Sequence, residues 1–123
     1  MTNISAARQG YGSASAPTRS YKSIEYDVLA QITRRLKAAA DKGPSGFAAL
    51  ASALHDNKRL WNVFALDVAD PNNKLPDSLR ARLFYLAEFT HSHTTAVLRR
   101  RAQVTPLIDI NMAILRGLRG GAD

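Results

Sequence analysis

The chain has 123 residues, of which 46% are hydrophobic and 22% are charged, so it can form one globular domain and is not expected to be disordered throughout. It contains no cysteine, which excludes disulfides, thiolate metal sites and cysteine nucleophiles, and it has no apolar run long enough to cross a membrane as a helix. Its 17 Lys and Arg residues against 10 Asp and Glu residues give a net charge of +7, which favours acidic partners, nucleic acid first among them.

The first 19 residues differ in composition from the rest of the chain. They include no acidic residue, and their only large apolar residues are Met1, Ile4 and Tyr11. A segment of this kind cannot bury enough surface to offset the entropy lost on ordering, so we expect a flexible N-terminal arm. The arm is a plain disordered tail, a segment that orders on a partner through Tyr11, or a mitochondrial transit peptide, whose amphipathic helix Gly10, Gly12 and Pro17 would break. It lacks the apolar stretch of a secretory signal.

The first helical pattern begins at residue 20, where apolar residues start to recur three or four positions apart. Ser20 can cap the start of this helix, and the Gly43-Pro44 pair ends it. The apolar positions expected to face the core are Tyr21, Ile24, Val28, Leu29, Ile32 and Leu36.

Ser45 can cap a second helical pattern, which a polar stretch around Asp56 interrupts. Residues 46–69 therefore form either one helix or two helices with a break between them. The second half of this segment is apolar almost all round, and a helix of this kind is buried on several sides. We expect residues 59–69 at the centre of the core.

A turn at residues 70–73 precedes a third pattern, which Pro76 opens. Its core positions alternate four and three apart, which is typical of antiparallel packing in a bundle. These positions are Leu79, Leu83, Leu86, Thr90, His93 and Val97. A last short helix opens at Thr105-Pro106 and ends at a glycine pair. Its expected core face comprises Leu107, Ile110, Ile114 and Leu118.

The predicted fold class is all-α, because no segment has a convincing strand pattern and no internal repeat is visible. We expect a compact bundle of four to five helices with a flexible N-terminal arm. The predicted organisation is the arm at residues 1–19, a single helical domain at residues 20–119 and a C-terminal tail at residues 120–123.

The sequence carries no zinc-protease or phosphate-loop motif, and we expect a non-enzymatic protein without catalytic residues, cofactor, metal or small-molecule substrate. His91 and His93 could suggest a metal site. Positions two apart on a helix diverge by about 200°, however, so we expect His93 on the apolar seam and His91 outside it.

Two basic clusters lie near predicted helix ends. They allow two interpretations: they neutralise the negative end of the helix dipole, or they form a patch that contacts RNA. The candidate patch comprises Arg34, Arg35, Arg99, Arg100 and Arg101. The aromatic residues lie mostly in core patterns away from these clusters, so charge alone supports only weak, salt-sensitive RNA binding.

An ordered series of short motifs resembles the bacterial flagellar biosynthesis regulator family FlaF over nearly the whole chain. A tyrosine in the arm, here Tyr11, also fits the family. The motifs are Asn57-Lys58-Arg59-Leu60-Trp61, Asp67, Asn73-Lys74-Leu75-Pro76, Leu79-Arg80-Ala81, Leu107-Ile108-Asp109-Ile110-Asn111 and Gly117-Leu118.

The resemblance implies a small cytoplasmic factor, without membrane insertion, that is needed for flagellin production and export. Members of the family are viewed as chaperones that bind flagellin, and as positive counterparts of FlbT, a repressor of flagellin translation. An α-helical groove is a natural receptor for the amphipathic terminal segments of flagellin. The alternatives are an RNA-binding regulator of flagellin mRNA and an adaptor for FlbT.

Six residues are candidates for contacting a protein partner: Tyr11, Asn57, Arg59, Tyr85, Phe89 and Asn111. Phe84 and Tyr85 are adjacent on a helix, so either both contribute to a broad core, or Tyr85 or Phe89 faces a partner. The two asparagines lie on apolar helical faces, where an unpaired amide is costly, so internal hydrogen bonds are the alternative to a binding role. We also expect an ion pair between Arg80 and Asp109.

Overall fold

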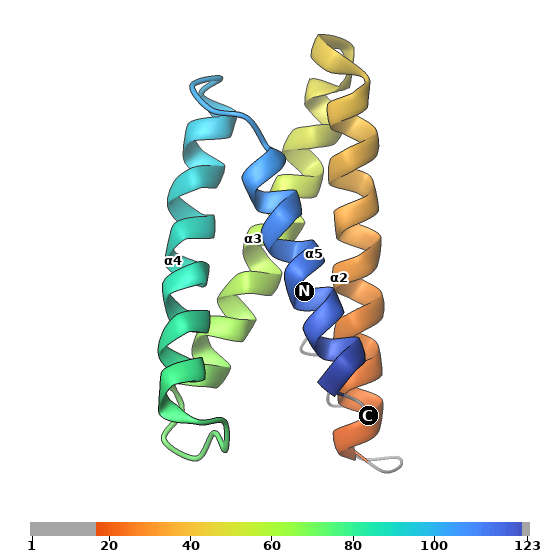
Figure 1. Cartoon of the computed structure of the whole chain (residues 1–123). Coiled ribbons are helices and arrows are strands. Elements are labelled where there is room, and N and C mark those ends of the chain that lie inside the picture. Colours follow the sequence, from red (N-terminus) through yellow and green to blue (C-terminus); the bar gives the residue numbers. More distant parts are fainter. Residues whose placement is uncertain (1–16, 122–123) are drawn as a thin grey trace.

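The computed structural model describes residues 17–121 and contains four α-helices within that range (Figure 1). They are α2 (Pro17–Asp41), α3 (Phe47–Ala69), α4 (Asp77–Leu98) and α5 (Thr105–Gly121), and the short 3-10 helix η1 (Gly43–Gly46) joins α2 to α3. Successive α-helices run in opposite directions along the bundle. The described residues form no strand, and the all-α class is confirmed.

Both ends of the helical region extend beyond their predicted limits. Helix α2 begins at Pro17, three residues before the predicted cap Ser20. Proline suits the first position of a helix because its fixed φ is helical and it has no N–H to satisfy. Helix α5 continues through Gly121 rather than ending before residue 120. The rest of the predicted arm, with Tyr11, lies outside the described residues.

A sharp connection turns the chain from α2 into α3. Gly43 has φ of +64°, a conformation that glycine adopts at little cost. Gly46 is buried against the end of α2, where an added Cβ would lie 2.3 Å from the carbonyl oxygen of Ala39. Glycine at position 46 therefore allows η1 to pack directly on the α2 backbone.

The segment at residues 46–69, for which one helix or two were expected, is one continuous helix from Phe47. The polar stretch in its middle does not break it, because two of its residues bind other helices. Asp56 accepts a hydrogen bond from Arg35 of α2 at 2.7 Å, and Asn57 is completely buried.

The core lies where all four helices come together. It is built from buried aliphatic side chains, and Trp61 is the largest fully buried residue. Helix α3 packs against both α2 and α4, whereas α5 lies mainly on α2. The aliphatic core residues are Leu29, Ile32 and Leu36 of α2, Leu54 and Leu60 of α3, Val97 of α4, Val104, and Leu107 and Leu115 of α5.

A buried polar cluster ties α5 to α2 and α3. The Oδ1 atom of Asn111 accepts a hydrogen bond from Trp61 Nε1 at 2.9 Å. Its Nδ2 atom donates to Asn57 Oδ1 at 2.8 Å and to Thr33 Oγ1 at 3.1 Å. Thr33 in turn donates to the carbonyl oxygen of Leu29. One asparagine thus links three helices inside a mainly apolar core.

The prediction that all of residues 59–69 lie in the core is wrong. Leu60, Trp61 and Val68 are buried, but Leu66 is 75% exposed. Leu66 lies two residues before Val68, hence about 200° around the helix from it. Helix α5 also leans toward α2 in its lower half, away from the lower part of α4 (Figure 1). The lower end of α3 is therefore covered on fewer sides than its composition suggests.

The predicted core faces of the last two helices are correct only in part. The buried residues of α4 are Ala87, Thr90, Thr94 and Val97, whereas Leu79 is exposed and Leu83, Leu86 and His93 are half-buried. In α5 the buried positions are Leu107, Asn111 and Leu115, with Ile110, Ile114 and Leu118 at their edges. The small buried residues of α4, such as Ala87, allow close contact with α3. Leu79 and Leu83 lie near the start of α4, where the helices cover one another less.

Arg80 closes the end of α3 rather than pairing with Asp109 as predicted. Its Nε atom donates to the carbonyl oxygen of Val68 at 2.9 Å, and Nη2 donates to that of Asp70 at 3.1 Å. These carbonyls lie at the C-terminal end of α3, where helical acceptors lack partners and attract positive charge.

Candidate functional site

The structure separates the predicted partner-binding aromatics. Tyr85 is 66% exposed and Phe84 is 41% exposed, so the interpretation in which both contribute to a broad core is wrong. Phe89 is half-buried, packs against the core and stacks on His93 with ring centroids 5.1 Å apart. His93 is fixed further by a 2.7 Å hydrogen bond between Nε2 and the carbonyl oxygen of Gln103. Tyr85 and Phe89 therefore both stay predictions as partner contacts, and Phe89 also packs against the core.

The two asparagines do not belong to a binding surface. Asn57 and Asn111 are both 0% exposed and bind each other inside the core, so neither can reach a partner on the surface. Of their two interpretations, the internal hydrogen bond is the correct one. Arg59 is exposed and borders a shallow hollow between α2 and α3.

The first basic cluster does not lie at a helix end. Helix α2 continues to Asp41 and has no basic residue in its last turn, so Arg34 and Arg35 lie inside the helix. Arg35 binds α3, donating to Asp56 Oδ2 at 2.7 Å and to Ser52 Oγ at 3.2 Å. Its side chain therefore contributes to the α2–α3 contact, whereas Arg34 is exposed.

The second basic cluster forms the turn that ends α4. Arg100 adopts φ of +60°, Arg101 N–H donates to Ala96 O, and Arg100 N–H donates to Val97 O, each at 2.9 Å. This pair of bonds is the Schellman motif, in which glycine normally takes the left-handed position. The guanidinium of Arg100 lies 4.3 Å from the ring centroid of Phe47. Arg99 and Arg101 flank this residue and are exposed.

Two hollows share His91 as a lining residue: the lower one lies between α3 and α4, and the upper one lies along α4 and the turn that follows it. We call the two hollows together the α3–α4 groove. The lower hollow is lined by Asn62, Ala65, Ala87, Glu88 and His91. The upper hollow is lined by His91, Ser92, Thr95, Ala96, Arg99 and Arg101. His91 lines both hollows, so they adjoin on α4. The groove changes from mixed polarity at its lower end to strongly basic at its upper end.

Exposed apolar side chains extend the groove at each end. Leu66 follows Asn62 by four residues on α3, and Phe84 precedes Glu88 by four residues on α4. Residues four apart share a helical face, so both lie below the lower hollow. Leu98, which is 41% exposed, follows His91 by seven residues and lies on the same face at the upper end. Tyr85 lies about 100° around α4 from Phe84, outside the groove.

The sequence interpretation did not assign this groove. Leu66 had been placed in the core, and Leu98 and Glu88 had no binding role. A signal was nevertheless present: the buried stripe of α3 runs through Asn57, Trp61 and Val68, and Leu66 falls outside that spacing.

The sequence model of the family described as flagellar protein FlaF matches residues 7–118. The match covers most of the chain, which therefore belongs to the FlaF family. No curated protein matches the chain significantly, and no solved structure does. None of the described helices is long and apolar enough to cross a membrane.

Proposed function

We propose that this FlaF protein is a non-enzymatic, cytoplasmic factor of flagellum biogenesis that binds flagellin before export, as a secretion chaperone, and promotes flagellin synthesis and export. The observation that carries the proposal is the set of large apolar side chains exposed beside the α3–α4 groove: Leu66, Phe84 and Leu98. Large apolar side chains exposed along one face are typical of interaction sites, because covering them gains about 25 cal/mol for each Å² of apolar surface removed from water.

An amphipathic helix is the class of ligand that suits such a surface. Helical grooves bind these ligands through apolar side chains spaced three, four or seven residues apart. The terminal segments of flagellin are amphipathic and unfolded before assembly, so they would gain order and bury their apolar face on this protein. Tyr85 lies next to the groove and can extend the contact.

Binding of flagellin mRNA is the second candidate function. It is supported by the exposure of Arg34, Arg99 and Arg101, none of which forms an ion pair with another described residue. In this alternative the arginines neutralise phosphates and binding depends strongly on salt. A role as an adaptor for FlbT would use an apolar surface rather than the arginines.

A pull-down from flagellated cells, with and without ribonuclease, tests the proposal. We expect purified protein to retain flagellin after ribonuclease treatment, because apolar contacts do not require RNA. The proposal is contradicted if flagellin is never retained while flagellin mRNA is. Retention of FlbT alone would support the adaptor alternative.

A further inference from the structure

We infer that the α3–α4 groove is a polarised docking site for an amphipathic helix, whose apolar residues cover Leu66, Phe84 and Leu98 and whose acidic side chains lie at Arg99 and Arg101. The inference rests on the proposed function and adds to it a site, a ligand chemistry and an orientation.

The lower end of the groove supplies the apolar contacts. Leu66 is 75% exposed, the most exposed large apolar residue that the structure describes, and Phe84 of α4 is 41% exposed. Between the two helices the floor is made of the small residues Ala65 and Ala87, which allow a ligand side chain to approach closely. This end therefore suits a large aliphatic or aromatic side chain of the ligand.

The upper end supplies the charge. The hollow there combines Arg99 and Arg101 with the hydroxyl groups of Ser92 and Thr95 and the imidazole of His91, and no acidic side chain lines it. Neither arginine forms an ion pair with any residue that the structure describes. A carboxylate from a ligand can accept hydrogen bonds from a guanidinium and from a neighbouring hydroxyl, which favours an acidic residue at this end.

Glu88 favours one orientation of a bound acidic ligand over the other. It lines the lower hollow, so an acidic residue of the ligand placed there would be repelled, whereas the same residue near Arg99 would be attracted. A ligand whose acidic residues all lie at the Arg99 end avoids this repulsion and gains the attraction. Fifteen residues separate Phe84 from Arg99, so the groove accommodates a helix of about 15 residues, or about 22 Å.

Paired variants of the full-length protein test the two ends separately. We expect Leu66→Ser together with Phe84→Ser to weaken the binding of unassembled flagellin by about tenfold or more, through lost apolar burial. We expect Arg99→Glu together with Arg101→Glu to weaken it at low salt, with a smaller effect at high salt because the attraction is screened.

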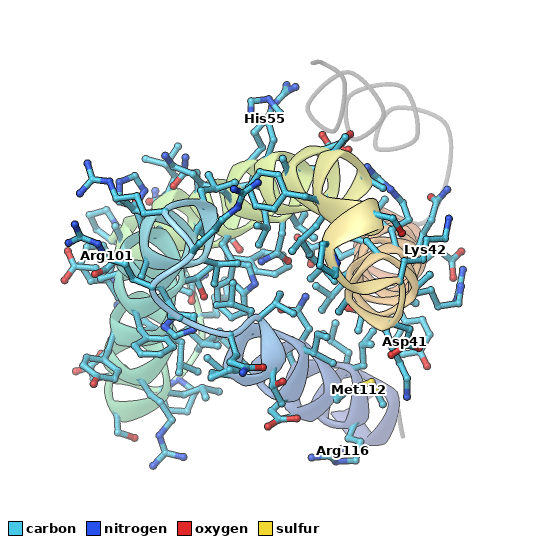
Figure 2. All side chains as sticks on the ribbon, turned by 90° about the horizontal axis from the view of Figure 1, so that it is seen from above. Asp41, Lys42, His55, Arg101, Met112 and Arg116 are labelled. Carbon is cyan, nitrogen blue, oxygen red and sulfur yellow. The ribbon has the colours of Figure 1, made fainter. Side chains whose placement is uncertain are left out.

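Helix α5 offers matched controls. The exposed fraction of Met112, 43%, is similar to the 41% of Phe84, and Arg116 is an exposed arginine. Figure 2 shows both residues on α5, whereas Arg101 lies on another side of the bundle. Met112→Ser and Arg116→Glu should leave the dissociation constant unchanged, and circular dichroism checks that every variant is folded.

A second measurement uses the absence of cysteine. A single Thr95→Cys substitution can carry an environment-sensitive fluorophore in the groove, and Ala113→Cys places the same label on the exposed side of α5. Addition of flagellin should change the emission at position 95 and not at position 113.

A designed amphipathic peptide of about 15 residues, with glutamates at one end, tests the groove without flagellin. It should bind the wild type, and a peptide with lysines at that end should bind the Arg99→Glu, Arg101→Glu variant instead. If only the peptides bind in this way, the groove is supported and the flagellin proposal fails.

The inference is overturned if flagellin binds the wild type and all groove variants equally, which leaves the proposed function intact. It is also overturned if neither flagellin nor either peptide binds. Self-association of the wild type that both groove variants abolish would identify a second copy as the occupant, and would overturn it as well.

Discussion

Trp61 is the residue whose replacement should destabilise the fold most clearly. It is the largest fully buried side chain, its ring meets Phe64 edge-on at 5.2 Å between centroids, and its Nε1 donates to Asn111 at 2.9 Å. Deleting a buried aromatic side chain costs roughly 3 to 5 kcal/mol in unfolding free energy. Trp61→Ala should fall in this range or above it, because it also leaves a buried acceptor on Asn111 without its donor.

Trp61→Phe keeps an aromatic ring, removes the N–H and leaves a smaller cavity than Trp61→Ala. The expected loss is at least about 1 to 3 kcal/mol, the usual cost of leaving a buried polar atom unpaired, and a double-mutant cycle isolates the polar part. In a double-mutant cycle with Asn111→Ala, the two changes should couple by about 0.5 to 3 kcal/mol, because the residues bind each other directly.

Urea unfolding followed by far-ultraviolet circular dichroism measures these values without relying on tryptophan fluorescence. A thermal melt gives a second estimate, in which each kcal/mol corresponds to about 4 °C for a chain of 123 residues. A Trp61→Ala variant that unfolds like the wild type would refute the buried position of Trp61. Strictly additive effects of Trp61→Phe and Asn111→Ala would refute the hydrogen bond between them.

Three further predictions concern single positions. Gly46→Ala should lower the free energy of unfolding by about 2 kcal/mol or more, because the added Cβ would overlap the Ala39 carbonyl. Gly117→Ala in α5 meets open space and should raise the free energy of unfolding by up to about 1 kcal/mol. Urea unfolding compares the two variants, and equal effects would contradict the close approach at Gly46. The Arg100→Gly variant should be more stable than the Arg100→Ala variant by about 1 kcal/mol, because both lose the contact with Phe47 but only glycine adopts the positive φ without strain. If thermal melts give the reverse order, position 100 carries no such backbone strain. Arg80→Ala should cost about 1 to 3 kcal/mol and increase amide exchange at the end of α3, and unchanged exchange there would contradict the capping role.

The helices could be predicted from the sequence because their signals are local. Apolar spacing locates each helix to within a few residues, Pro76 and Thr105-Pro106 mark the starts of α4 and α5, and Gly43-Pro44 marks the end of α2. The continuity of α3 could not be predicted, since its polar middle is stabilised by contacts with other helices. Asp56 meets Arg35 across 21 residues of sequence, and Asn57 meets Asn111 across 54.

Which side of each helix is buried was harder to predict, because burial depends on where neighbouring helices lie. Leu66 and Phe84 belong to apolar segments that predict core positions, yet both are exposed where the bundle opens. The need of Asn111 for internal partners could be predicted from its apolar surroundings. The identity of those partners could not, because they come from α2 and α3.

The salt dependence of flagellin binding tests the proposed function most directly. Affinities of the purified protein for unassembled flagellin and for the leader of flagellin mRNA should be measured between about 50 and 200 mM salt. A single-stranded RNA held by four phosphate contacts would lose about fiftyfold in affinity over this range, whereas a helix held mainly by apolar burial should lose only a few-fold. We predict measurable flagellin binding with the smaller loss. No flagellin binding at any salt, together with tight leader binding that falls steeply with salt, would contradict the account.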